Sequence, residues 1–237
     1  MIKYFTILPF FILFSCASLH TPSPHFTPTI TKKNQFEGEA SFGYGPASVS
    51  AAYAPLNHLT ILGNVQALVL TKNAGFHQRN AELGIGTYGS CRKLIYGFNA
   101  GYGLGSYNWN YNQFNDSTTY SILTNGSFQK LMIQSFIAIT DDATDPGWYA
   151  GISLKGNYYW DQYTTLRNST QQANDFNGLE KNMSFEPCLF VRDFFTNRFY
   201  LNMQAGMNIS YDHTMFWPTQ YLFFRLGIGI KLNGETN

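Results

Sequence analysis

The chain has 237 residues, a formal net charge of +1 and 12% charged residues, about half the charged share of an ordinary soluble domain. It has no basic patch and no acidic run, so its charge gives no indication of a nucleic-acid partner. Aromatic residues make up 17% of the chain and glycines number 21. Low charge with abundant Tyr, Phe and Gly is typical of a β-barrel membrane protein, although soluble β-sandwiches can approach this composition.

The first 15 residues predict a secretory signal peptide. Lys3 precedes the apolar run YFTILPFFILFS, which is shorter than the roughly 20 apolar residues that cross a bilayer as a helix. The stretch LFSC, ending at Cys16, resembles the lipobox of bacterial lipoproteins. This resemblance implies cleavage between Ser15 and Cys16 and attachment of a diacylglycerol and an amide-linked acyl chain to Cys16. The alternative is ordinary cleavage just after Cys16, which would discard the cysteine.

Residues 16–33 predict a tether between the lipidated cysteine and a folded domain. This stretch is rich in proline and shows no apolar periodicity. Proline-rich chain stays extended and solvated. We therefore expect a solvated tether on the periplasmic side of an outer membrane.

From Phe36 onward, apolar and polar residues alternate with period two, the pattern of half-buried strands. The predicted strands cover residues 36–44, 48–53, 59–69, 80–89, 95–105, 130–139, 148–160, 185–192, 199–209 and 222–232. About ten strands, within a range of eight to twelve, predict an all-β, up-and-down antiparallel β-barrel over residues 34–237, embedded in a membrane. Pro187 falls within a strand, where it predicts a β-bulge.

The two faces of these strands differ in charge and size. One face carries bulky Phe, Leu, Ile and Tyr, and the other carries glycines with charges of both signs. The charged set is Glu37, Glu39, Glu82, Glu186, Lys130, Lys155, Arg192, Arg225 and Lys231. Charges shut away from bulk water need partners, and this set supplies both signs, so it predicts an interior charge network. A soluble, lipid-tethered barrel with an apolar pocket is the alternative.

The connections predict which end faces the cell exterior. If the N-terminus is periplasmic, the brief connections lie in the periplasm, and the long stretches 108–127 and 161–181 are outer loops. The aromatic run YNWNYNQF, Tyr107 to Phe114, fits either packing at the membrane rim or stacking on glycans.

The stretch FEGEASFGYGPASVSAAYAPLNHLTILGNV resembles small outer-membrane β-barrel lipoproteins of the Bacteroidota. The segments AELGIGTY and IYGFNAGYGLGSY fit the same pattern, and together they cover Phe36 to about Tyr107. The resemblance implies the fold and an outer-membrane location, and it transfers no catalytic residues.

No catalytic residue, metal site or cofactor is predicted. The five histidines show no metal-ligand spacing, and Cys91 and Cys188 are expected to stay free thiols. The expected function is a structural, accessory or surface-interaction role in the cell envelope. Its partners would be outer-membrane lipid, and another envelope protein or a surface glycan that contacts 108–127 and 161–181. A carrier of a small apolar ligand and a lipid-modifying barrel enzyme are the alternatives.

Overall fold

The computed structural model describes residues 22–44, 46–70, 74–115, 118–141, 147–168, 173–210 and 222–232. The predicted signal peptide, with Ser15 and Cys16, lies outside these ranges.

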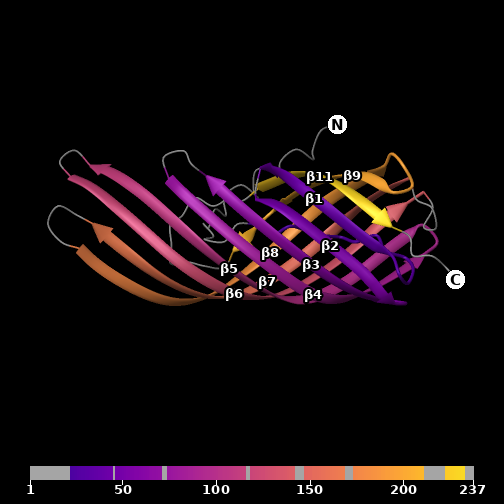
Figure 1. Cartoon of the computed structure of the whole chain (residues 1–237), viewed down its shortest axis with the longest axis horizontal. Coiled ribbons are helices and arrows are strands. Elements are labelled where there is room, and N and C mark those ends of the chain that lie inside the picture. The colour runs from indigo at the N-terminus through magenta and orange to yellow at the C-terminus, as the bar shows by residue number, and fades with distance from the viewer. Residues whose placement is uncertain are drawn as a thin grey trace, which may run out of the picture.

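The described residues form one closed antiparallel β-barrel (Figure 1). Its elements are β1 (Phe36–Tyr44), β2 (Ala47–Leu56), β3 (Leu59–Leu70), β4 (Ala74–Cys91), β5 (Leu94–Asn115), β6 (Thr118–Thr140), β7 (Trp148–Asn168), β8 (Ala173–Phe194), β9 (Phe199–Met207), β10 (Ile209–Ser210) and β11 (Leu222–Leu232). Each of the strands β1 to β7 pairs with the strand that follows it, and β9 and β10 both pair with β8. β9 also pairs with β11, and β11 pairs with β1, which closes the barrel. Only Asn208 separates β9 from β10, so the two count as one interrupted strand and the barrel has ten strands. The predicted fold is confirmed.

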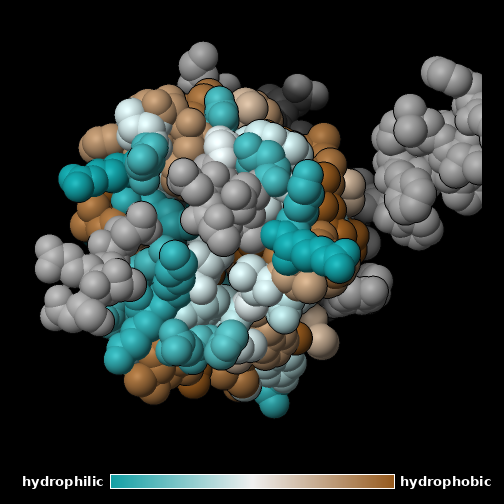
Figure 2. Space-filling view, turned by 90° about the vertical axis from the view of Figure 1, so that its right-hand side faces the viewer, coloured by the Kyte–Doolittle hydropathy of each residue, from teal (hydrophilic) through white to brown (hydrophobic). Residues whose placement is uncertain are grey.

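The alternation of the sequence sets which side chains face out of the barrel. Large apolar side chains cover its outside, among them Ile61, Leu83, Ile133, Ile152 and Ile228. The inner face carries the polar and charged residues, and the strands show the alternating burial that period two predicts. Seen from the right-hand end of Figure 1, hydrophobic residues follow the outer contour and hydrophilic ones lie across the end (Figure 2). The predicted orientation, with apolar side chains outward and charged side chains inward, is confirmed. The alternative of a soluble barrel with an apolar pocket is therefore excluded.

The two ends of the barrel differ. The short-turn end carries the connections 57–58, 92–93, 141–147 and 195–198 and the end of β11. At the opposite, long-hairpin end, the hairpins β5–β6 and β7–β8 project well beyond β1, β2 and β11 (Figure 1). The stretches 108–127 and 161–181 are therefore mainly paired strand, because the ladders run on to Asn115↔Thr118 and Asn168↔Ala173. The prediction of long loops there is corrected.

Pro187 interrupts strand pairing without a bulge. The register of β8 with β7 is continuous through Leu154↔Pro187. On its other side, the pairs Phe185↔Ile209 and Cys188↔Gly206 keep one register, and no pair is formed between them. Proline has no N–H to donate, so the ladder simply skips this position. The predicted bulge is wrong.

Glycines on the inner face make room for large side chains. A Cβ on Gly229 would lie 2.0 Å from Cζ of Tyr200, and one on Gly227 would lie 2.8 Å from Oε1 of Glu39. A side chain at either position would displace Tyr200 or Glu39 from the barrel interior.

Candidate functional site

The barrel lumen is occupied by the chain itself. Residues 22–30, called the lumen segment from here on, are all buried and precede β1 inside the barrel. The sequence predicted a solvated tether over 16–33, and this part of the prediction is wrong. The lumen segment contains Pro22, Pro24 and Pro28, which have no N–H and favour extended chain. A proline-rich strand can therefore run through a closed barrel without joining its sheet.

Polar side chains of the wall bind the carbonyl groups of the lumen segment. Arg225 Nη2 donates to the Pro22 carbonyl oxygen at 2.6 Å, and Lys231 Nζ donates to that of Thr29 at 2.8 Å. The remaining contacts run from Lys155 Nζ to the Pro24 oxygen at 3.3 Å, from Gln204 Nε2 to the His25 oxygen at 2.8 Å, and from Gln134 Nε2 to the Phe26 oxygen at 3.2 Å. In a solvated tether these carbonyl oxygens would accept hydrogen bonds from water. Here they accept them from side chains of the wall, because buried backbone groups need hydrogen-bond partners.

Carboxylates bind the amide groups of the same segment. Glu186 accepts from the Ser23 N–H at 3.1 Å, and Glu37 accepts from the N–H and hydroxyl of Thr29 at 2.9 and 3.0 Å. Hydrogen bonds to charged groups are the stronger kind, worth about 1.5–3 kcal/mol each in folded proteins. The segment is therefore held along its length.

Two apolar side chains anchor the segment against the wall. Phe26 and Ile30 are buried in a cluster with Ala52, Ala54, Leu62, Tyr88 and Met132. These wall residues point inward from β2, β3, β4 and β6. The inner face thus carries an apolar patch where the segment presents apolar side chains.

The charged residues singled out from the sequence all lie on the inner face and are buried. Glu82 forms ion pairs with Lys130 and with Lys155, the latter at 2.9 Å. Arg192 forms ion pairs with Glu37 and, at 3.2 Å, with Glu39.

The remaining three act largely through the lumen segment. Glu186 lies 3.5 Å from Nε2 of His25, and Lys231 reaches the Thr29 carbonyl group. Arg225 donates to the Pro22 carbonyl group, and its Nε and Nη1 find no hydrogen-bond partner among the described residues. The interior is thus a joint network of wall and segment.

His25 is the one histidine inside the lumen within the described chain. Its Nδ1 lies 3.0 Å from Oγ of Ser153, and its ring stacks on Phe223 at 5.6 Å between centroids. The described residues hold no group of three or more His, Cys, Asp or Glu side chains that could bind a metal ion. Cys91 is exposed at the end of β4, and Cys188 is buried on the inner face; both are free thiols.

The projecting hairpins are held together by aromatic packing. Tyr107, Phe128, Tyr159 and Tyr163 form a buried cluster at their base. The Tyr107 hydroxyl donates to the carboxylate of Asp161 at 3.0 Å, which ties β5 to β7. Tyr107, the first residue of the aromatic run 107–114, therefore packs inward, and its ring is not available to a ligand.

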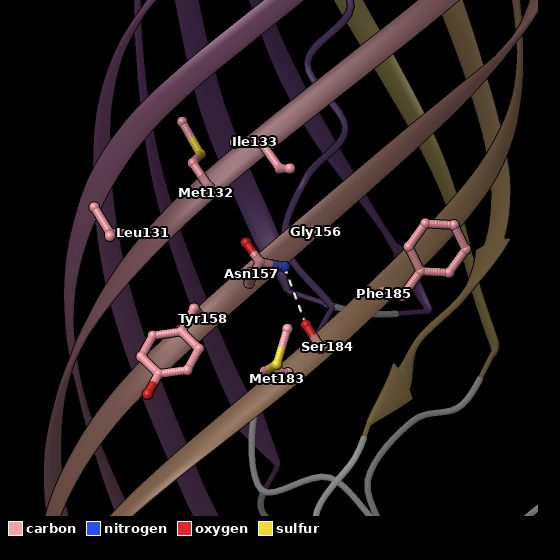
Figure 3. A pocket seen from close by; sticks show the side chains of 9 residues that line it. All are labelled: Leu131, Met132, Ile133, Gly156, Asn157, Tyr158, Met183, Ser184 and Phe185. Carbon is pink, nitrogen blue, oxygen red and sulfur yellow. Dashed lines mark hydrogen bonds between the residues drawn. The ribbon is translucent and has the colours of Figure 1, made fainter.

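A groove of about 430 Å³ lies in the wall across β6, β7 and β8 (Figure 3). Gly156 leaves a gap between the outward side chains of Leu131, Ile133, Tyr158, Met183 and Phe185. Behind it, on the inner face, Asn157 Nδ2 donates to Ser184 Oγ at 3.1 Å. The groove faces outward, and its lining is mostly apolar.

Sequence reasoning missed the lumen segment, the main feature of the interior. One signal was available: the predicted inner face held five cations against four carboxylates. The surplus is matched by backbone oxygens of residues 22–30, which a search for side-chain partners does not consider.

No protein-family model matches the sequence, and no curated protein matches it. The fold is similar to the translocator domain of the autotransporter NalP from Neisseria meningitidis, with a TM-score of 0.50, 9% identity, and coverage of 83% of this chain and 86% of that one. It is also similar to the N-terminal β-barrel domain of Pseudomonas aeruginosa OprF, with a TM-score of 0.34 and 9% sequence identity. That match covers 84% of this chain and 98% of the OprF domain. A major outer membrane protein from Thermus thermophilus matches with a TM-score of 0.35 and 13% sequence identity. That match covers 84% of this chain and 98% of the other. The chain therefore has the fold of an outer-membrane-type β-barrel.

Proposed function

We propose that this protein is a closed, non-conducting outer-membrane lipoprotein that presents its long hairpins to partners at the cell surface. The observation that carries the proposal is the occupied lumen. A barrel of about ten strands has an interior that side chains nearly fill, and here a buried peptide segment takes up the remaining space. A pore or a carrier of small ligands would need that space.

The hairpins β5–β6 and β7–β8 supply the interaction surface. Paired strands held by an aromatic base keep a fixed shape, so they bind a partner without a large loss of chain entropy. Bacterial barrels carry their longer connections outside the cell, which supports an outward orientation of the long-hairpin end. Another envelope protein or a surface glycan is the expected partner.

Catalysis is not part of the proposal. The buried carboxylates and cations are engaged with each other or with the lumen segment. The outward groove at Gly156 is lined almost wholly by apolar groups, which suits contact with lipid chains and not bond cleavage.

Planar-bilayer recording tests the closed lumen. The wild-type protein should give no stable conductance. A variant with residues 22–30 replaced by a Gly/Ser segment of equal length should give opening events, because it lacks the groups that the wall binds. Its control is a Gly/Ser replacement of the hairpin tip 116–117, which should stay closed. Steady conductance of the wild type would refute the proposal.

Pull-down from detergent-solubilised outer membranes tests the interaction surface. Removing 110–123 and joining Trp109 to Thr124 through an Asn-Gly turn shortens β5–β6 at a paired position. Removing 166–175 in the same way shortens β7–β8 at Thr165↔Phe176. Partner capture should be lost with the shortened hairpins and kept by a barrel whose 92–93 turn is replaced by Asn-Gly. Equal capture by all variants would exclude the hairpins as the binding surface.

A further inference from the structure

We infer that the lumen segment carries the N-terminal chain through the barrel, so that lipidated Cys16 emerges at the long-hairpin end and its acyl chains enter the outer leaflet. This rests on the lipoprotein assignment proposed above. It differs from the sequence-based expectation of a tether on the periplasmic side of the membrane.

The contacts of the lumen segment show its direction. Thr29 is bound by Lys231, one residue before the end of β11 at the short-turn end. His25 is bound by Gln204, five residues into β9 from that end, and Pro24 by Lys155, seven residues into β7. Read toward the N-terminus, the segment therefore runs from the short-turn end into the barrel.

Ser23 lies deeper still by this measure, and Pro22 contacts β11 seven residues before the end of that short strand. Ser23 is bound by Glu186, eight residues before the end of β8, and by Lys130, ten residues before the end of β6. Pro22 is bound by Arg225, which lies three residues from Leu222, the first residue of β11 at the long-hairpin end. The chain at Pro22 is therefore closer to the long-hairpin mouth on this side of the barrel.

The remaining length of chain decides between the two exits. Six residues separate Cys16 from Pro22, and extended chain of that length reaches at most about 20 Å. From Arg225 to Leu222, at the long-hairpin end, three residues of tilted strand correspond to a rise of about 8 Å along the barrel axis. The seven residues from Arg225 to the end of β11 correspond to about 18 Å, after which the chain would still have to cross the rim to reach lipid.

Space excludes the return path as well. All nine residues 22–30 are buried among the side chains of the wall, so the lumen between Pro22 and the short-turn end already holds one strand of chain. A second strand running back beside them has no room at the packing density of protein interiors.

Arg225 gives a second, independent observation. Its side chain is fully buried, and its Nε and Nη1 have no acceptor among the described residues. Buried guanidinium donors are normally satisfied. The proposed route would supply these donors with backbone carbonyl acceptors.

Thiol labelling on whole cells tests the route. The test variant is Ser18→Cys combined with Cys91→Ser and Cys188→Ala, so that residue 18 carries the thiol beyond Cys16. The reagent is a maleimide on a polyethylene glycol chain too large to cross the outer membrane. The matched control is Cys188→Ala alone, which keeps the exposed Cys91 at the short-turn end. The unboiled gel mobility of both proteins verifies that each barrel is folded.

The thiol at residue 18 of the test variant should react on intact cells, whereas Cys91 of the control should react only after permeabilisation. Palmitate labelling of both proteins is measured in parallel. Palmitate incorporation with labelling of residue 18 only after permeabilisation would overturn the route and leave the lipoprotein assignment standing. Absence of palmitate would overturn the anchor itself, and the proposed position with it.

Discussion

Arg192 of β8 and Glu37 of β1 form an ion pair inside the barrel, although 155 residues separate them in the chain. Both side chains are fully buried. The same guanidinium donates to Glu39 at 3.2 Å and to the hydroxyl of Thr29 at 3.0 Å. One cation thus joins two wall strands to the lumen segment.

Replacing Arg192 by methionine should destabilise the barrel strongly. The change leaves Glu37 and Glu39 buried without their cation, and breaking a buried pair by removing one partner costs about 3–5 kcal/mol. Urea unfolding in detergent micelles would measure this loss. The matched control is Arg198→Met in the exposed turn before β9, which should change the free energy of unfolding by no more than about 0.5 kcal/mol.

The double variant Arg192→Met/Glu37→Gln should lose less stability than the sum of its single variants, because it removes one uncompensated charge. Strict additivity would show that the two side chains do not interact in the folded barrel.

Arginine on the outward face should impair insertion. Ile152 and Ile228 point away from the lumen and are 48% and 55% exposed, so each faces lipid in the membrane. An arginine near the midplane of a barrel costs about 2–4 kcal/mol. Ile152→Arg and Ile228→Arg should therefore reduce the fast-migrating, unboiled band on gels, whereas Ile228→Leu should not.

Lys155→Gln is the inward counterpart of those variants. Glu82 keeps its ion pair with Lys130 when Lys155 is lost, so assembly should be affected less than by either arginine. Normal assembly of both arginine variants together with failure of Lys155→Gln would reverse the assignment of inside and outside.

The apolar anchors Phe26 and Ile30 should contribute to holding the lumen segment in place, beside its hydrogen bonds to the wall. Phe26→Ala and Ile30→Ala remove buried side chains from the cluster with Leu62 and Met132, a change that typically costs about 2–5 kcal/mol. Hydrogen exchange of residues 22–30, followed by mass spectrometry, should show faster exchange in both variants.

Thr27→Val is the control for these variants, because the Thr27 hydroxyl is buried and has no hydrogen-bond partner among the described residues. Its exchange should match the wild type. Equal acceleration in all three variants would indicate that the segment is not docked through Phe26 and Ile30.

Cys16→Ala should abolish incorporation of palmitate and leave a precursor that is uncleaved or cut elsewhere, because the lipid is attached through this cysteine. Metabolic labelling and the mass of the mature protein check both effects. The variant barrel should still resist carbonate extraction, since its apolar band does not depend on acyl chains. Normal processing and labelling would end the lipoprotein assignment.

The alternation of residues was enough to predict the barrel, the number of strands and the facing of side chains such as Ile228 and Lys231. These features follow from a local rule, because successive side chains of a strand point to opposite faces whatever the strand pairs with. The position of Pro187 within a strand was equally local, but its effect on pairing was not, since that depends on which residues of β9 and β10 lie opposite.

Only the tertiary structure decided what fills the lumen and how far the hairpins extend. The stretches 108–127 and 161–181 have weak alternation, and they form strands because their partners in the ladder satisfy their backbone groups. Residues 22–30 have no periodicity at all, so the sequence alone favoured a solvated tether. Their burial depends on Arg225, Gln204 and Lys231, which closure of the barrel brings from the far end of the chain to the carbonyl groups of Pro22, His25 and Thr29.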